Sequence, residues 1–238
     1  MNIKIFIGFC TTMILTVGCQ KANVSVTPLS SLNMVNAMVG VPAVKANWTN
    51  SSSKSSSQFY SQISATVGYG ASYTYGVLAN KSIPLTVVST ADTVNALFSG
   101  NFNLPTGGVF TFFLAGYPGA IDTVLIKEAI PVYNDSSCGV RFINLVYNGN
   151  PISIRQASSP GIADFSAIGY KQYTDFKQYT ADVAHGSYGF QIVDDISNVV
   201  LASYTLSAPL FHNVTLTWVG QAGGTGGGAP KIFRINNY

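Results

Sequence analysis

The residue types that most often perform acid–base or metal chemistry are scarce in this chain. The two histidines, His185 and His212, stand in turn-like segments, and we find no His, Cys or carboxylate beside them at metal-ligand spacing. The pair Asp194–Asp195 offers too few oxygens for a calcium loop. The glycine run at 223–228 lacks the Gly-Lys-Ser/Thr ending of a phosphate-binding loop. The sequence therefore predicts no catalytic residue, no metal site and no cofactor, and it favours a protein that is not an enzyme.

One aromatic segment has residue types suited to binding. Tyr170, Tyr173, Phe176 and Tyr179 follow one another at a spacing of three, with lysines and glutamines between them. Aromatic rings with neighbouring amides can stack on sugar rings and hydrogen-bond their hydroxyls, so these four residues are our candidate ligand contacts. The same spacing puts alternate rings on opposite faces of a strand, so a mixture of core and surface aromatics is the alternative interpretation.

The N-terminus has the pattern of a secretory signal. Lys4 precedes an apolar run from Ile5 to Val17, and Gly18 comes directly before Cys19. The run is shorter than the ~20 residues that a membrane-spanning helix needs. Residues 15–19 resemble a bacterial lipobox, which predicts lipidation of Cys19 and a membrane anchor at the mature N-terminus; ordinary cleavage nearby is the alternative. Gln20 at the second mature position implies delivery to the outer membrane.

Composition excludes two broad classes of protein. Only 9% of the 238 residues are charged and 47% are hydrophobic, so the chain is not a disordered polyelectrolyte. Twelve Lys and Arg against nine Asp and Glu give a net charge of +3 with no basic cluster, which argues against nucleic-acid binding. Once Cys10 is removed with the signal and Cys19 is acylated, Cys138 has no partner for a disulfide. We expect it to be a small, half-buried residue.

An internal repeat predicts the architecture. The segment 97–116 aligns without a gap on 201–220, and 32–36 aligns on 140–144. The sequence thus predicts two domains, 31–132 and 133–238, after a signal peptide at 1–18 and a lipidated tether at 19–30.

The aligned blocks alternate with a period of two. Phe110 and Leu114 of the first copy correspond to Val214 and Trp218 of the second, while Thr111 and its counterpart Thr215 lie on the other face. Such alternation is typical of half-buried strands. Short strands between Gly, Asn, Ser and Pro clusters predict an all-β fold, with two tandem antiparallel β-sandwich domains of immunoglobulin or transthyretin type.

Several segments together resemble a known family. They are SLNMVNAMVGVPAV, VGYGASYTYGVLANKSIPLTVV, AGYPGAIDTVLIKEAIPVYN and CGVRFINLVYNGNPISI. The pattern is similar to the bacterial family designated domain of unknown function 4397. The resemblance implies an exported, often lipid-anchored protein built of tandem β-sandwiches, from a Gram-negative bacterium of the Bacteroidota. It carries no catalytic motif and transfers no functional residue.

Taken together, the sequence favours a non-enzymatic binding or interaction module at the outer membrane or cell surface, with a glycan or an envelope protein as partner. The alternative is a structural subunit of a fimbrillin-like surface fibre, in which two-domain lipoproteins polymerise by exchanging strands. An enzyme ranks third. It would require Asp164, Asp175, Asp182 or His185 to converge in one cleft.

Overall fold

The computed structural model describes residues 27–48 and 65–237, and within them the chain is all-β. The first eight strands are β1 (Leu29–Asn36), β2 (Ala43–Asn47), β3 (Thr66–Gly68), β4 (Ser72–Leu78), β5 (Ile83–Ser89), β6 (Ala96–Phe102), β7 (Val109–Tyr117) and β8 (Ala120–Lys127). The second eight are β9 (Ser137–Tyr147), β10 (Ile152–Gln156), β11 (Ala163–Ile168), β12 (Lys177–Thr180), β13 (Ser187–Asp194), β14 (Val200–Ser207), β15 (Asn213–Gln221) and β16 (Lys231–Asn236). Two short 3-10 turns, η1 (Val183–His185) and η2 (Gly226–Gly228), complete the elements. None of the helical segments in these ranges has the length and apolar character needed to cross a membrane.

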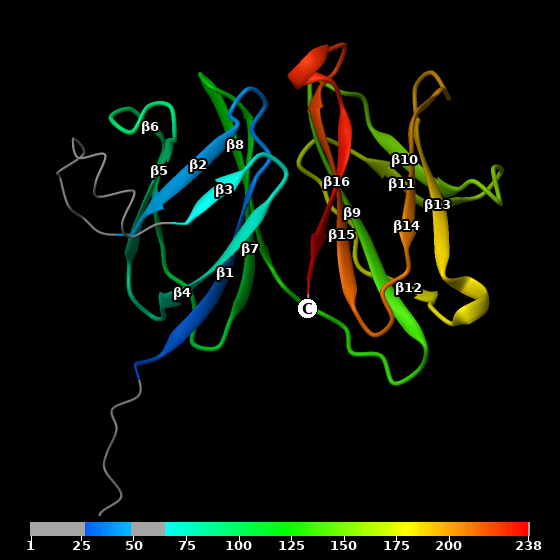
Figure 1. Cartoon of the computed structure of the whole chain (residues 1–238), viewed down its shortest axis with the longest axis horizontal. Helices are drawn as coiled ribbons and strands as arrows, with labels where there is room; N and C mark the ends of the chain where they lie inside the picture. Colours follow the sequence, from blue (N-terminus) through cyan, green and yellow to red (C-terminus); the bar gives the residue numbers. More distant parts are fainter. Residues whose placement is uncertain (1–26, 49–64, 238) are drawn as a thin grey trace, which may run out of the picture.

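The strands form two pairs of four-stranded sheets, which confirms the predicted pair of β-sandwiches. The first eight strands make sheets of order β4-β1-β7-β8 and β3-β2-β5-β6, and the second eight make sheets of order β12-β9-β15-β16 and β11-β10-β13-β14. Figure 1 shows the two sandwiches side by side. β1 begins at Leu29, slightly before the predicted domain start, and the predicted boundary after residue 132 lies in the segment between β8 and β9.

The repeat extends to strand register. Leu32 lies opposite Phe110 where β1 pairs with β7, and Val140 lies opposite Val214 where β9 pairs with β15. These are the residues that the sequence alignment makes equivalent. Each copy therefore places its core-facing side chains in the same way.

One strand pair in each sandwich departs from the antiparallel prediction. β1 with β7, and β9 with β15, run parallel, whereas every other pair among the named strands is antiparallel. Side-chain alternation has the same period in both kinds of pairing, so the sequence pattern cannot distinguish them. The resulting order also differs from the seven-stranded immunoglobulin order, in which the first two strands are neighbours.

A third apolar cluster joins the two sandwiches. The sheet containing β1 and β7 faces the sheet containing β9 and β15 (Figure 1). Between them lies a cluster of buried side chains: Val35, Ala37, Phe113, Ala115, Ile126, Ile143, Leu145, Val219 and Ile235. We call this the interdomain core. It is separate from the cores inside each sandwich.

The interdomain core corrects the expectation of half-buried strands. β9 is buried along its length up to its last residue, and β15 is buried from Asn213 to Gly220. Thr111 and Thr215, which the alternation puts on the outer face, are only 1% and 0% exposed. The second face of these strands is covered by the other domain, which the sequence pattern of one strand does not reveal.

A buried polar row crosses the same interface. Arg141 Nη2 lies 2.6 Å from Glu128 Oε1, and the two side chains are 3% and 1% exposed. Thr111 donates to the same carboxylate oxygen at 2.5 Å, while Arg141 Nε donates to Thr215 Oγ1 at 2.8 Å. Thr215 in turn donates to Asn237 Oδ1. Glu128 is in the segment after β8 and Arg141 is in β9, so this row ties one domain to the other.

The first strand of each repeat contains an equivalent buried asparagine. Asn36 Nδ2 donates to the carbonyl oxygens of Val41 and Val67, and Asn144 Nδ2 donates to the carbonyl oxygen of Ile168. Each Oδ1 accepts the backbone N–H two residues later. Both asparagines are fully buried, and both link the strand to the opposite sheet.

Candidate binding cavity at the end of the second sandwich

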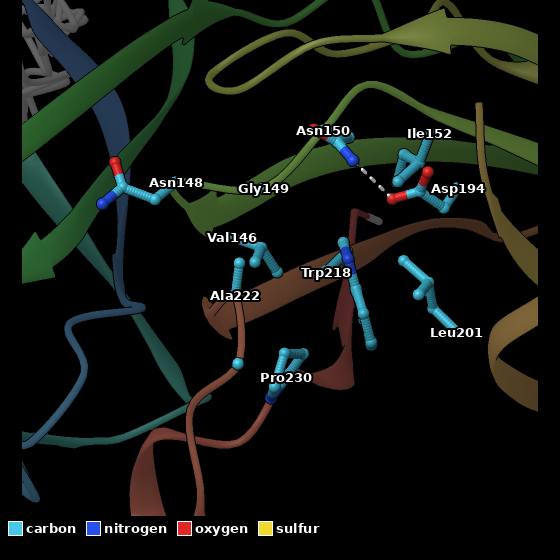
Figure 2. Close-up of a pocket in the computed structure, with 11 residues that line it drawn as sticks. Val146, Asn148, Gly149, Asn150, Ile152, Asp194, Leu201, Trp218, Ala222 and Pro230 are labelled. Atoms are coloured by element: carbon cyan, nitrogen blue, oxygen red, sulfur yellow. Dashed lines mark hydrogen bonds between the residues drawn. The ribbon is translucent and has the colours of Figure 1, made fainter. Parts of the chain in front are cut away.

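A cavity of about 340 Å³ opens at one end of the second sandwich, between the ends of its two sheets (Figure 2). Its lining residues are Val146, Asn148, Gly149, Asn150, Ile152, Asp194, Leu201, Trp218, Ala222, Gly223 and Pro230. Most of these side chains are apolar, and the polar ones are two amides and one carboxylate. A mostly apolar lining with a few polar groups is the usual composition of a small-molecule site.

The turn after β9 builds one wall. Val146 is 3% exposed and its carbonyl accepts the N–H of Gly149, while Asn148 has a φ of 56°. Asparagine tolerates this left-handed conformation better than most residues. The tight turn leaves the side chains of Asn148 and Asn150 at the cavity, and Figure 2 shows them pointing to opposite sides.

The carboxylate of Asp194 is held by its own loop. Oδ1 accepts the backbone N–H groups of Ile196 and Ser197 and the Ser197 hydroxyl, and Oδ2 accepts Asn150 Nδ2 at 3.0 Å (Figure 2). The hydrogen bond from the Ser197 backbone, followed by that from Asn150, holds the pKa of this carboxyl below its usual range. Asp194 is therefore charged at neutral pH, and it orients Asn150 at the cavity edge.

Trp218 provides the large aromatic surface. It lies in β15, is 3% exposed and lines the cavity. Its indole N–H donates to no partner among the described residues. In Figure 2 the ring nitrogen is at the end of the indole on the side of Asn150 and Asp194. The Trp218 nitrogen is not among the buried unpartnered side-chain atoms of the described ranges, so this donor is accessible to an acceptor on a ligand in the cavity.

The corresponding end of the first sandwich differs. The opening there is lined by Ala96, Leu97, Gly119 and Ile121, none of which has a polar side chain. In the sequence alignment Leu97 corresponds to Leu201, and Leu114 corresponds to Trp218. The cavity of the second repeat is therefore lined by an indole, a carboxylate and amides, whereas the side chains that line this opening in the first repeat are apolar.

The four aromatic residues predicted as ligand contacts do not gather at one site. Tyr179 is 5% exposed in the core of the second sandwich and donates to Asp164 Oδ2 at 2.8 Å. Tyr170 donates to Asp122 Oδ2 across the interdomain boundary at 2.9 Å. Burial, together with these hydrogen bonds to carboxylates, raises the pKa of both phenols. The strand thus turns one ring inward, as the alternative interpretation expects.

The other two predicted contacts lie over one guanidinium. The centre of the Arg141 guanidinium is 4.6 Å from the centroid of the Phe176 ring and 5.9 Å from that of Tyr173. Tyr173 is 45% exposed and Phe176 is partly buried. These two rings line a separate cavity with Arg141.

The acid–base residues named for an enzyme are dispersed. Asp182 and His185 form an exposed pair at 2.7 Å, a contact that was not predicted from the sequence. Asp164 accepts hydrogen bonds from Lys177, Tyr179 and Gln156. Asp175 lies beside the Arg141 cavity. No group of three or more His, Cys, Asp or Glu residues in the described ranges is arranged to hold a metal ion.

Of the two cysteines considered in the predicted mature chain, the structure describes only Cys138. Cys19, the predicted lipidation site, lies outside the ranges that the structure describes. Cys138 is fully buried in the second sandwich, more than the half-burial that we expected, and burial raises the pKa of its thiol. A neutral, buried thiol is a packing residue.

No family model matches the chain, and no curated protein matches it. The resemblance to domain of unknown function 4397 therefore stays a prediction. The residues that line the cavity were missed as a set in the sequence, although Asp194 had been considered as a calcium ligand. The available signal was the replacement of Leu114 by Trp218 between otherwise similar repeats.

Proposed function

We propose that this protein is a non-enzymatic binding module of the bacterial cell envelope, and that it takes a glycan into the cavity beside Trp218. The observation that carries the proposal is the combination of an unpartnered indole N–H, an apolar lining and the fixed amide of Asn150 at one end of the second sandwich. The proposal includes export and attachment to the outer membrane through lipid on Cys19.

The chemistry of the cavity suits a sugar ring. A sugar has apolar C–H faces and hydroxyl edges, so it needs an apolar surface together with hydrogen-bonding groups. Trp218 and Leu201 supply the surface, and Asn148 and Asn150 supply donors and acceptors at the edge. The carboxylate of Asp194 already accepts hydrogen bonds from its own loop and from Asn150, so we assign it the role of positioning the Asn150 amide.

The position of the cavity also supports the proposal. β1 begins at Leu29 at one end of the molecule, whereas the loop between β15 and β16 is at the opposite end (Figure 1). The cavity includes residues of that loop, Ala222 and Gly223. A lipid attached ahead of Leu29 would hold the cavity away from the membrane.

A glycan-binding screen tests the proposal. Mature protein is applied to an array of bacterial and host glycans, and hits are measured by titration calorimetry. We expect Trp218→Leu, which installs the residue of the first repeat, to lower affinity at least about tenfold, because a stacked aromatic surface contributes on the order of 1–3 kcal/mol. Trp48→Phe in the first sandwich is the matched control and should bind normally. Turnover of a glycan or peptide that depends on Asp194 would contradict a non-enzymatic role, and an envelope protein that binds at Trp218 would replace the glycan as partner.

The lipid anchor is tested separately. Metabolic labelling with an alkyne fatty acid should mark the wild-type protein and bring it into the outer-membrane fraction. Cys19→Ser should abolish both the label and the membrane association, while Cys138→Ser, which alters only the buried thiol, should keep the label. Equal labelling of the Cys19→Ser variant would contradict the anchor.

The fibre alternative keeps one structural feature in its favour. β14 is the last strand of its sheet, so one edge of its backbone has no neighbouring strand, and it contains no charged residue to discourage pairing. Ile196 and Val199 beside it are 72% and 55% exposed. If the protein polymerises through this edge, Ser203→Lys with Thr205→Lys should abolish the assemblies seen by electron microscopy of membrane extracts, and monomers throughout would argue against a fibre.

A further inference from the structure

We propose a second binding site, for a carboxylate-bearing sugar, in the cavity beside the guanidinium of Arg141. This cavity of about 320 Å³ lies against the interdomain interface and is lined by Ile126, Lys127, Ala129, Pro131, Arg141, Tyr173, Asp175 and Phe176. It shares no lining residue with the cavity beside Trp218. The proposal for the Arg141 cavity does not depend on what binds beside Trp218.

Arg141 is a buried cation with unused hydrogen-bond donors. Its side chain is 3% exposed; Nε donates to Thr215 and Nη2 donates to Glu128. Arg141 lines the cavity, and its Nη1 has no hydrogen-bond partner among the described residues. A guanidinium has five N–H donors in one plane, so donors remain at the Nη1 edge after the two protein contacts.

The surroundings of Arg141 orient those donors. Phe176 lies over the guanidinium at 4.6 Å and Tyr173 at 5.9 Å, so the plane is covered by aromatic rings. The contacts to Glu128 and Thr215 fix its rotation. A ligand must therefore approach the edge of the guanidinium, the direction from which a carboxylate accepts two parallel N–H groups.

The formal charges around the cavity cancel, which argues against a doubly charged ligand. Arg141 is paired with Glu128, and the oppositely charged Lys127 and Asp175 both line the cavity. Lys127 and Asp175 are exposed, so solvent screens them, whereas the N–H groups of Arg141 act from a buried position. A single carboxylate fits this arrangement better than a doubly charged phosphate, which would lack a second buried cation.

The remaining lining favours a sugar acid as the body of the ligand. Tyr173 presents a ring and a hydroxyl at an exposed position, and Ile126, Ala129 and Pro131 supply apolar surface. A hexuronate has one carboxylate, C–H faces and several hydroxyls on a single ring. Those three features correspond to the Arg141 edge, the apolar wall and Tyr173.

Two charges of opposite sign, Lys127 and Asp175, give a sharp test because both side chains are exposed. Binding of D-glucuronate is measured by NMR titration of the mature protein, with D-glucose as the neutral control. We expect the Arg141 Nε–H resonance to shift with glucuronate while those of Arg155 and Arg234 do not. Lys127→Gln should weaken binding about two- to fivefold, and Asp175→Asn should strengthen it by a similar factor, the size expected for screened surface charges. Lys81→Gln, in an exposed turn of the first sandwich, should have no effect.

The outcomes are distinct. A shift at Arg141 with opposite effects of the two variants supports the site. No shift at Arg141 at tens of millimolar glucuronate, or equal binding of glucose, overturns it. Tighter binding of a short peptide through its free terminal carboxylate than of glucuronate overturns the assignment to sugar acids. Trp218→Leu should leave glucuronate binding unchanged, so failure here and failure of the glycan cavity are separable.

Discussion

Arg141 has a structural role that its position in the sequence does not indicate. It is the first arginine of the chain and stands inside an apolar strand. Its partner Glu128 is the only glutamate, and one of its carboxylate oxygens, Oε2, is buried without a hydrogen-bond partner in the described structure. A buried ion pair of this kind costs desolvation, and removing one member leaves the other uncompensated.

The Arg141–Glu128 pair predicts a non-additive pattern of stabilities. Arg141→Met should lower the free energy of unfolding by about 3–5 kcal/mol, because it leaves a buried carboxylate unpaired. The double variant Arg141→Met with Glu128→Leu should recover most of that loss, since neither charge remains. Denaturant titration of both, with the exposed Arg234→Met as control, measures the effect. A double variant no more stable than Arg141→Met would show that the pair does not act as a unit.

Asp194 predicts an acid-dependent loss of stability. Its pKa in the folded protein is below the ordinary value of about 3.9, so its contribution is present above that value and is lost as the pH falls through the folded pKa. The difference in unfolding free energy between wild type and Asp194→Asn should therefore be larger at about pH 6 than at about pH 3. A difference that is the same at both pH values would mean that the charge of Asp194 is unimportant.

At the scale of the element, the first strand of each repeat carries an equivalent buried asparagine. Asn36 and Asn144 each donate to a backbone carbonyl of the opposite sheet and accept the backbone N–H two residues later. Their equivalence was visible in the sequence alignment, but their burial was not, because asparagine is a residue that usually signals a loop. Here the amide hydrogen-bonds a strand of one sheet to the backbone of the facing sheet.

The two asparagines should be of similar importance. Asn36→Ala and Asn144→Ala each leave buried backbone groups unsatisfied, at about 1–3 kcal/mol for each group. We expect both variants to lose several kcal/mol of stability by denaturant titration. Asn80→Ala, in an exposed turn, should lose much less. A large effect at only one of the two buried positions would contradict their equivalence.

At the scale of the whole molecule, the sequence predicted the number of sandwiches but not that they pack against each other. Period-two alternation identified the strands and the repeat identified the two copies. Thr111 and Thr215 looked like surface residues, because alternation reports one face and gives no information on what covers the other. Tyr179 and Trp218 show the same limit: the sequence identified aromatic residues in strands, and both lie in the core of the second sandwich, but only the packing of the sheets shows that Trp218 also lines a cavity.

The interdomain core predicts that both sandwiches unfold together. Inter-domain motion is the default unless the interface is large and apolar, and here Phe113, Ile143 and Val219 are fully buried in it. The two tryptophans, Trp48 and Trp218, report on different sandwiches. Each of the variants Trp48→Phe and Trp218→Phe keeps one tryptophan, so its fluorescence follows the unfolding of one sandwich. In each variant we expect the fluorescence transition to coincide with the loss of strand signal measured by circular dichroism on the same variant. Separate transitions would show that the sandwiches are independent.

The place of β1 within its sheet has a mechanical consequence. β1 is hydrogen-bonded to β4 on one side and to β7 on the other, and the chain ahead of Leu29 continues from its end. A pull on that leading segment, against a ligand held at the far end of the second sandwich, acts along the strand and loads both ladders in shear. The hydrogen bonds must then give way together instead of opening one after another from a free edge. The first strand of the described fold is thus placed to bear tension applied at its leading end.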